Sequence, residues 1–110
     1  MKLTVTGRHI EITDAIKQHL AQKMEKTIKD LGESADVHVA LSVEKHRHFA
    51  EITIKTKAIT LHSEDETDDL YTAMDSALLK MEKQIRKHKS RYKTLKIKKS
   101  VEQKNRTEPE

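Results

Sequence analysis

The residues best suited to chemistry in this sequence are cations that crowd toward its carboxyl end. Residues 80–99 contain ten lysines and arginines against one acid, Glu82, whereas residues 1–66 contain 10 cations and 11 acids. A solvated helix face usually alternates its cations with acids four residues away, and this segment does not. The alternative of a solvated lysine-rich face is therefore less favoured than binding to a polyanion.

Length and composition restrict the kind of protein that carries these cations. The chain has 110 residues, a formal net charge of +4 and no cysteine. This length suits one small domain, and the missing cysteines exclude disulfides and thiolate chemistry. The sequence has no apolar run of membrane-spanning length, and its first residues alternate between apolar and polar types unlike a signal peptide. We therefore expect a cytoplasmic protein with no membrane partner.

Two predicted helices must position the cations. The first follows Thr13, whose hydroxyl can cap it, and its apolar spacing from Ile16 to Leu31 predicts about five turns before a stop at Gly32. The second begins near Glu66–Asp69, where the acids from Glu64 to Asp69 suit a helix amino terminus. Its apolar stripe comprises Leu70, Met74, Leu78, Met81, Ile85, His88 and Tyr92. Cations away from the apolar stripes are Lys23, Lys26 and Lys29 in the first helix and Lys80, Lys83, Lys87 and Arg91 in the second.

Alternating apolar residues predict the strands. Residues 2–7, 37–44 and 50–55 each have one apolar face, and a short strand surrounds Ile59 and Leu61. The order is βαβββα, an α+β fold in which two helices cover one face of a four-stranded sheet. We expect one domain over residues 1–95 and a disordered tail over residues 96–110 that changes from basic to acidic.

Other chemistries find little support in the residues. Two glycines cannot form a phosphate-cradling loop, and no nucleophile or metalloprotease motif is present, so no enzyme and no small-molecule substrate are expected. His46 with His48, or His38 with His62, could approach a metal, but solvated histidines are the favoured interpretation, and no metal or cofactor is predicted. With three aromatic residues, the sheet cannot stack several bases. Recognition should therefore use helices, phosphates and shape.

Several segments, in order along the chain, resemble one bacterial family. They are similar to motifs of ribosome hibernation-promoting factors and ribosome-associated inhibitors, also called sigma-modulation proteins, and the likeness covers about residues 1–95. The likeness is to the short members of the family, which lack the second domain of the longer members. The matching segments are GRHIEITDAI (7–16), VEK (43–45), AEITI (50–54), DLYTAMDSA (69–77) and KMEKQIRKHK (80–89).

The resemblance implies a fold like a double-stranded-RNA-binding domain and a partner on the ribosome. It implies binding to the small ribosomal subunit and its ribosomal RNA, in the channel of mRNA and the A- and P-site tRNAs. Arg91 is added from its helical position alone, and Arg8 and Lys45 are loop candidates with less support. The residues implied to contact ribosomal RNA are Lys23, Lys26, Lys29, Lys80, Lys83, Arg86, Lys87 and Lys89.

The resemblance also implies a mechanism and leaves alternatives open. A folded domain held by phosphate contacts would exclude tRNA and mRNA, stop translation reversibly and preserve inactive ribosomes under stress. The partners would be intact ribosomes, either as single particles or as dimers, and the intermediate length of the tail does not decide between them. A rival interpretation, in keeping with the older family label, is a protein-interaction regulator such as a modulator of a sigma factor.

Overall fold

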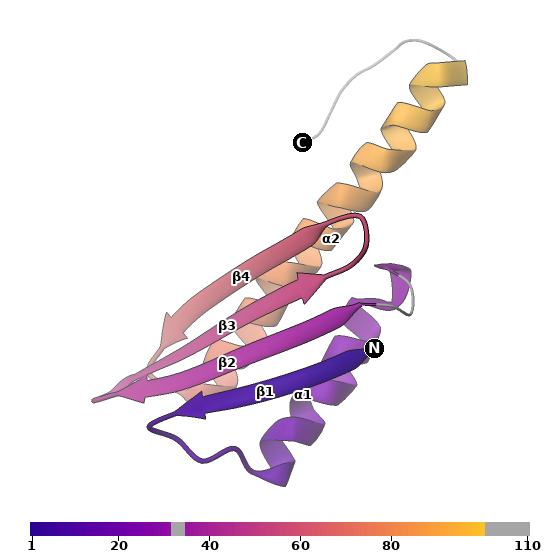
Figure 1. Ribbon diagram of the computed structural model, residues 1–110. Coiled ribbons are helices and arrows are strands. Elements are labelled where there is room, and N and C mark those ends of the chain that lie inside the picture. The colour runs from indigo at the N-terminus through magenta and orange to yellow at the C-terminus, as the bar shows by residue number, and fades with distance from the viewer. Residues whose placement is uncertain (32–34, 101–110) are drawn as a thin grey trace.

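A four-stranded sheet forms one layer of the protein and two helices form the other (Figure 1). The computed structural model describes the backbone of residues 1–31 and 35–100, and the side chains of residues 1–88 except 30 and 32–34. The strands lie in the order β1-β2-β3-β4, with β1 parallel to β2 and the other pairs antiparallel. The elements are β1 (Lys2–Arg8), α1 (Asp14–Thr27), the 3₁₀ helix η1 (Lys29–Leu31), β2 (Asp36–Glu44), β3 (Arg47–Lys55), β4 (Thr60–Thr67) and α2 (Leu70–Ser100).

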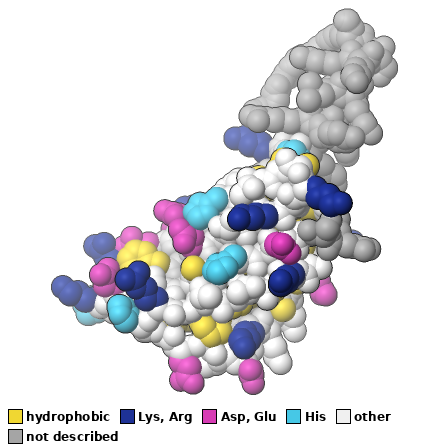
Figure 2. Space-filling view, in the orientation of Figure 1, with side chains coloured by type: hydrophobic (Ala, Val, Ile, Leu, Met, Phe, Trp, Pro, Cys, Tyr) yellow, Lys and Arg dark blue, Asp and Glu magenta, His cyan; other side chains and the backbone are white. Residues whose placement is uncertain are grey.

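The core lies between the sheet and the helices, as the βαβββα prediction requires. Strand alternation turns one set of side chains from β2 and β3 toward the helices, and these side chains are fully buried. The opposite face of the sheet carries polar residues and has no helix over it (Figures 1 and 2). The fold prediction is thus confirmed. The largest fully buried side chains are Leu20, Met24, Val37, Val39, Leu41, Ile52, Ile54, Met74 and Met81.

Helix α1 begins where the capping residue predicts. The Thr13 hydroxyl accepts a hydrogen bond from the Ile16 amide at 3.2 Å, which satisfies an amide that the helix itself leaves without a partner. Gly7 in β1 lies under the chain that leads to this cap, because a Cβ atom there would be 2.7 Å from the Ile10 carbonyl oxygen. The helix ends at Thr27, earlier than predicted, and η1 continues the chain to Leu31. The predicted stop at Gly32 lies outside the described residues.

The boundary between β4 and α2 differs from the sequence prediction. The acids at positions 64–66 belong to β4 instead of the helix start, and α2 begins at Leu70. Ser63 interrupts the apolar alternation of β4, yet its side chain is buried and donates a hydrogen bond to the Ala77 carbonyl oxygen in α2 at 2.8 Å. Asp69 caps α2 by accepting the Thr72 amide at 2.9 Å, and the hydrogen bonds from Thr72 lower the pKa of the Asp69 carboxyl.

Helix α2 is the longest element of the protein. It continues to Ser100, five residues past the predicted domain boundary at residue 95. Its apolar stripe is buried from Met74 to Ile85, while Leu70 and His88 are partly buried. The side chain of Tyr92 and residues 101–110 of the predicted tail lie outside the described part. None of the described helices is long and apolar enough to cross a membrane.

Candidate nucleic-acid interface

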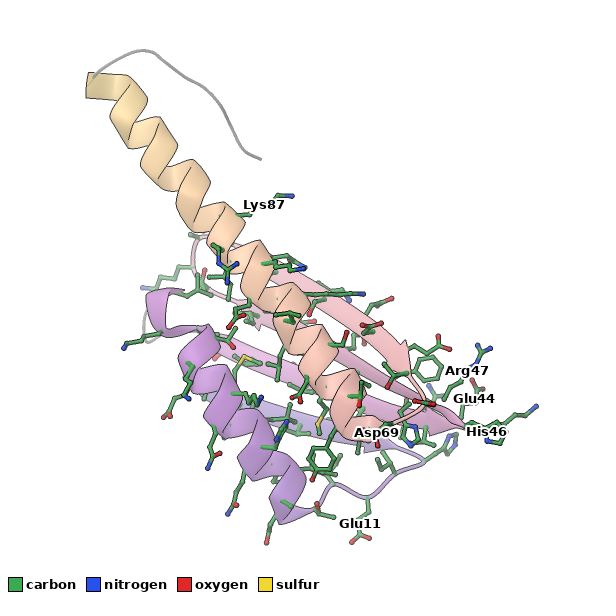
Figure 3. The ribbon with its side chains drawn as sticks, turned by 180° about the vertical axis from the view of Figure 1, so that it is seen from behind. Glu11, Glu44, His46, Arg47, Asp69 and Lys87 are labelled. Carbon is green, nitrogen blue, oxygen red and sulfur yellow. The ribbon has the colours of Figure 1, made fainter. Side chains whose placement is uncertain are left out.

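The two helices lie side by side on the sheet and run in the same direction (Figures 1 and 3). Successive lysines and arginines along each helix therefore lie nearer to the same end of the domain. On α1 and η1 these are Lys23, Lys26 and Lys29, all exposed. On α2 they are Lys80, Lys83, Arg86 and Lys87, also exposed. We call these seven residues the helix-layer cations. Lys26, in the last turn of α1, also interacts favourably with the dipole of that helix.

Four helix-layer cations are free to meet an external anion. Among the described side chains, Lys26, Lys29, Lys83 and Lys87 form no ion pair with an acid. Lys83 lies on the side of α2 opposite Met81 and Ile85, so the sheet does not shield it. Lys87 projects from the outer part of the helix (Figure 3). Ammonium groups that are held on rigid helices and are not neutralised suit contacts with a phosphate backbone.

The position of Lys80 on α2 suggests a side chain that points straight into solvent, but its ammonium turns toward the sheet. Its ammonium reaches the edge of β4, where it donates to the Glu64 carbonyl oxygen at 3.2 Å and lies 3.6 Å from the Asp65 carboxylate. Gln84, one turn later, donates to the His62 carbonyl oxygen on the same edge. Lys80 thus helps to join α2 to β4, and with 53% of its side chain exposed it also remains accessible.

Asp65 anchors this junction between α2 and β4. Its carboxylate accepts a hydrogen bond from the Ser76 hydroxyl in α2 and another from the Glu66 amide at 2.8 Å. The Ser76 bond is the main cause that lowers the pKa of Asp65 below its ordinary value of 3.8, with the charge of Lys80 contributing less.

We expect Ser76→Ala to raise the pKa of Asp65 toward 3.8, as measured by a carboxyl NMR titration. A carboxyl whose pKa is lowered by folding stabilises the fold above its unfolded pKa, and this stabilisation is lost as the pH falls through the folded pKa. The variant should therefore be less stable than the wild type at about pH 6, and the difference should shrink toward about pH 3. A difference in unfolding free energy that is independent of pH would contradict this role for Asp65.

A cluster of polar side chains fixes α1 against α2. His19 of α1 forms a 2.7 Å hydrogen bond to the Asp75 carboxylate of α2, and its ring meets Tyr71 edge to face at 5.0 Å. Lys23 lies 3.8 Å from the same carboxylate. These contacts hold Lys23 at the groove between the helices, so this cation is partly neutralised. The groove is lined by Gln22, Lys23, Lys26, Thr27, Asp75, Leu78, Leu79 and Glu82.

The remaining predicted residues divide into two groups. Arg8 ends β1 and Lys45 lies in the β2–β3 turn with a positive φ of 58°; both are exposed. They lie at the end of the sheet where α2 begins, away from Lys87 (Figures 1 and 3). Of the helix-layer cations, Lys80 lines one pocket together with Arg8. Arg86 is exposed and 3.8 Å from Glu82. Lys89 and Arg91 belong to α2, but their side chains lie outside the described part.

The open face of the sheet has a different character. Cations, acids and histidines are mixed on it (Figure 2), and Arg47 is paired with Glu66 at 3.0 Å. Phe49, the one phenylalanine, is only partly exposed there, so this face provides no row of exposed rings for bases. Charge and exposure therefore favour the helix layer over the sheet as a surface for nucleic acid.

The two histidine pairs that the sequence offered as metal ligands lie differently in the structure. His46 lies in the β2–β3 turn and His48 faces the helices, so these two do not share one side of a strand as predicted. His38 and His62 do share the open face, with Thr53 between them in register. One group of described side chains brings potential metal ligands within 4.8 Å of one another, namely Glu51, His62 and Glu64. Sequence reasoning had not paired His62 with these acids.

Known proteins resemble the chain in sequence and in fold. It is 32% identical over 93 residues to the ribosome hibernation promoting factor of Escherichia coli K12, covering 84% of this chain and 98% of that protein. It is 37% identical over 94 residues to the ribosome hibernation promotion factor of Bacillus subtilis, covering 83% of this chain and 50% of that protein.

Solved structures agree with the sequence comparison. The Protein Y amino-terminal domain of Thermus thermophilus superimposes with a TM-score of 0.72 at 30% identity, over 77% of this chain and 96% of that domain. A ribosomal subunit interface protein of Coxiella burnetii shares the fold with a TM-score of 0.66 at 22% identity, over 82% of this chain and 99% of that one. The family model described as Sigma 54 modulation protein / S30EA ribosomal protein matches residues 3–93. The chain therefore belongs to the Sigma 54 modulation protein / S30EA ribosomal protein family, the family that its sequence motifs resemble.

Proposed function

We propose that this protein is a cytoplasmic ribosome hibernation factor. It binds the small ribosomal subunit in the channel of mRNA and the A- and P-site tRNAs, blocks translation and preserves inactive ribosomes under stress. The relatives named for ribosome hibernation support the general role. The observation that carries the proposal for this chain is a set of exposed lysines on α1, η1 and α2 that form no ion pair among the described side chains, namely Lys26, Lys29, Lys83 and Lys87.

The mechanism is steric and requires no catalysis. Lysines on rigid helices contact ribosomal-RNA phosphates without reading the base sequence, and the folded domain then occupies space that tRNA and mRNA need. Arg86 and the half-exposed side chain of Lys80 add to this contact, and Lys89 and Arg91 extend it along α2. Lys23 contributes beside the His19–Asp75 contact. Arg8 and Lys45, at the other end of the domain, would touch a separate part of the subunit.

A salt series tests the proposal. Purified protein is sedimented with small subunits at increasing potassium chloride, and the bound fraction gives the affinity at each concentration. With about six phosphate contacts, log affinity should fall against log salt with a slope of roughly −4 to −5. A flat response, or binding to RNA polymerase holoenzyme in place of ribosomes, would contradict the proposal and favour a sigma-factor modulator. Sucrose gradients of the treated ribosomes distinguish single inactive particles from dimers.

A further inference from the structure

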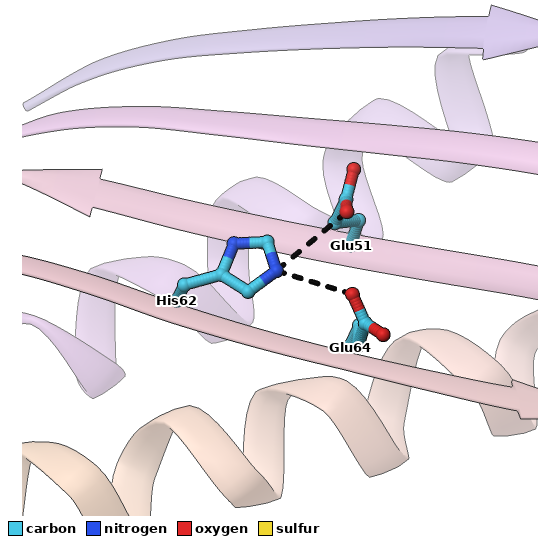
Figure 4. A group of neighbouring side chains, drawn as sticks. All are labelled: Glu51, His62 and Glu64. Atoms are coloured by element: carbon cyan, nitrogen blue, oxygen red, sulfur yellow. Dashed lines mark hydrogen bonds and ion pairs between the residues drawn. The ribbon is translucent and has the colours of Figure 1, made fainter.

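We propose that Glu51, His62 and Glu64 form a binding site for a divalent transition-metal ion such as zinc (Figure 4). The site lies on the open face of the sheet, on the opposite side of the molecule from the helix layer. Its three residues are exposed, so an ion can reach them directly from solvent. The proposal is independent of ribosome binding, because it uses none of the helix-layer cations.

Strand geometry brings the three side chains together. His62 and Glu64 are two residues apart on β4, so both project from the same face of the sheet. Glu51 of β3 is the direct antiparallel partner of Glu64. The side chains of directly paired residues are neighbours, and like charges at such positions repel each other. Two adjacent strands therefore hold two carboxylates beside one imidazole at a place that favours a positive charge.

The distances among the ligand atoms suit a small metal ion. The Nε2 atom of His62 lies 3.2 Å from a Glu64 carboxylate oxygen and 3.6 Å from a Glu51 carboxylate oxygen (Figure 4). Ligand atoms around a tetrahedral zinc ion, with bonds of about 2.0–2.2 Å, are separated from one another by about 3.3–3.6 Å. The two carboxylate oxygens lie within 4.8 Å of each other, and turning the exposed glutamate side chains would bring all three atoms into the first coordination shell. Water would complete the coordination.

The second nitrogen of His62 is held in the manner of a metal ligand. Its Nδ1 atom lies 3.0 Å from the Thr53 hydroxyl oxygen, and Thr53 is the direct partner of His62 across the strands. When Nδ1–H donates to this hydroxyl, the lone pair of Nε2 is directed toward the two carboxylates. Histidines that bind metals usually donate their other ring N–H to an oxygen acceptor, which fixes the ring orientation. With an ion in place of the hydrogen bond between Nε2 and Glu64, Thr53 would supply that acceptor.

The other charges nearby do not neutralise the pair of acids. In the part of the chain whose side chains are described, no lysine or arginine forms an ion pair with the carboxylate of Glu51 or Glu64. Lys80 contacts Glu64 through a different atom, since its ammonium donates to the backbone oxygen of Glu64. An imidazole ligand suits zinc, copper or nickel, whereas magnesium and calcium prefer oxygen ligands alone. The ligand set therefore selects zinc over magnesium.

Metal titration of the full-length protein tests the site. Zinc binding is measured by calorimetry, and cobalt(II) is used as a spectroscopic substitute whose visible absorption reports four-coordinate geometry. We expect one ion per chain in the wild type. We expect affinity to fall at least tenfold in His62→Ala, Glu51→Gln and Glu64→Gln, because each removes a ligand. Magnesium in large excess should not displace the zinc.

His38→Ala is the matched control. His38 is exposed on the same face and contacts a threonine hydroxyl, Oγ1 of Thr6, at 3.3 Å, but it is not part of the cluster. This variant should bind zinc as the wild type does. The two glutamine variants preserve side-chain size, so they test the site even if His62→Ala disturbs the strand. The proposal would be overturned if the wild type did not bind zinc or if the three ligand variants bound zinc as tightly as the wild type. It would also be overturned if His38→Ala lost as much affinity as the ligand variants.

Discussion

Reversing two charges on α2, in the variant Lys83→Glu with Lys87→Glu, is expected to lower the affinity for small subunits by about 100-fold or more. Both lysines are exposed and form no ion pair among the described side chains, so each is available for a phosphate. Glutamates in their places would lose two contacts and repel the RNA backbone. The salt slope should also become shallower by about 2. Co-sedimentation over the same potassium chloride series measures both effects.

The control for this variant changes charge by the same amount elsewhere. Lys17→Glu with Lys57→Glu alters one exposed lysine in the first half of α1 and one in the β3–β4 turn, neither of which is among the helix-layer cations. It should sediment with subunits almost as the wild type does. Equal losses in the two variants would mean that only net charge matters. Lys80→Glu is a poorer probe, because it would also disturb the contact of Lys80 with Asp65.

Truncating the centre of the core, in the variant Met81→Ala, is expected to lower the free energy of unfolding by about 2–5 kcal/mol. Met81 of α2 is 0% exposed and belongs to the cluster that packs α2 on the sheet. The shorter side chain would leave a cavity that rigid strands cannot fill by collapse. Urea denaturation followed by circular dichroism measures the change.

Leu79→Ala is the matched control on the same helix. Leu79 is 53% exposed, and leucine and alanine are both good helix formers, so we expect a change within about 0.5 kcal/mol. Similar losses in the two variants would mean that α2 is not packed on the sheet through Met81. If Leu79→Ala alone weakened subunit binding, the groove between the helices would be part of the interface.

Local patterns were sufficient to predict the fold. Thr13 marked the start of α1, and the period of buried residues such as Met74 and Met81 marked the inner face of α2, because capping and amphipathicity act over a few residues. Alternation also predicted the covered and open faces of the sheet. The extent of β4 could not be obtained in this way. Ser63 breaks its apolar pattern and is buried only because Ala77, 14 residues away, supplies a hydrogen-bond acceptor.

In the functional surfaces, too, spacing along one element predicted exposure, whereas contacts between distant segments were not predicted. Helical spacing correctly predicted that Lys26, Lys83 and Lys87 are exposed. The contact of Lys80 with β4 and that of Glu51 with His62 depend on how distant segments pair, which spacing along one element does not reveal. A cross-strand alignment of β3 with β4 is the signal that would have found the second contact, since it places Glu51 opposite Glu64.

A cryo-electron-microscopy reconstruction of the small ribosomal subunit with this protein bound tests the central proposal most directly. We predict density for the domain in the channel of mRNA and tRNA, with α1 and α2 facing ribosomal-RNA phosphates and Lys83 and Lys87 within contact distance of them. The open face of the sheet should point away from the RNA. Density outside the channel, or RNA contacts made by the sheet while the helix layer faces solvent, would contradict the account.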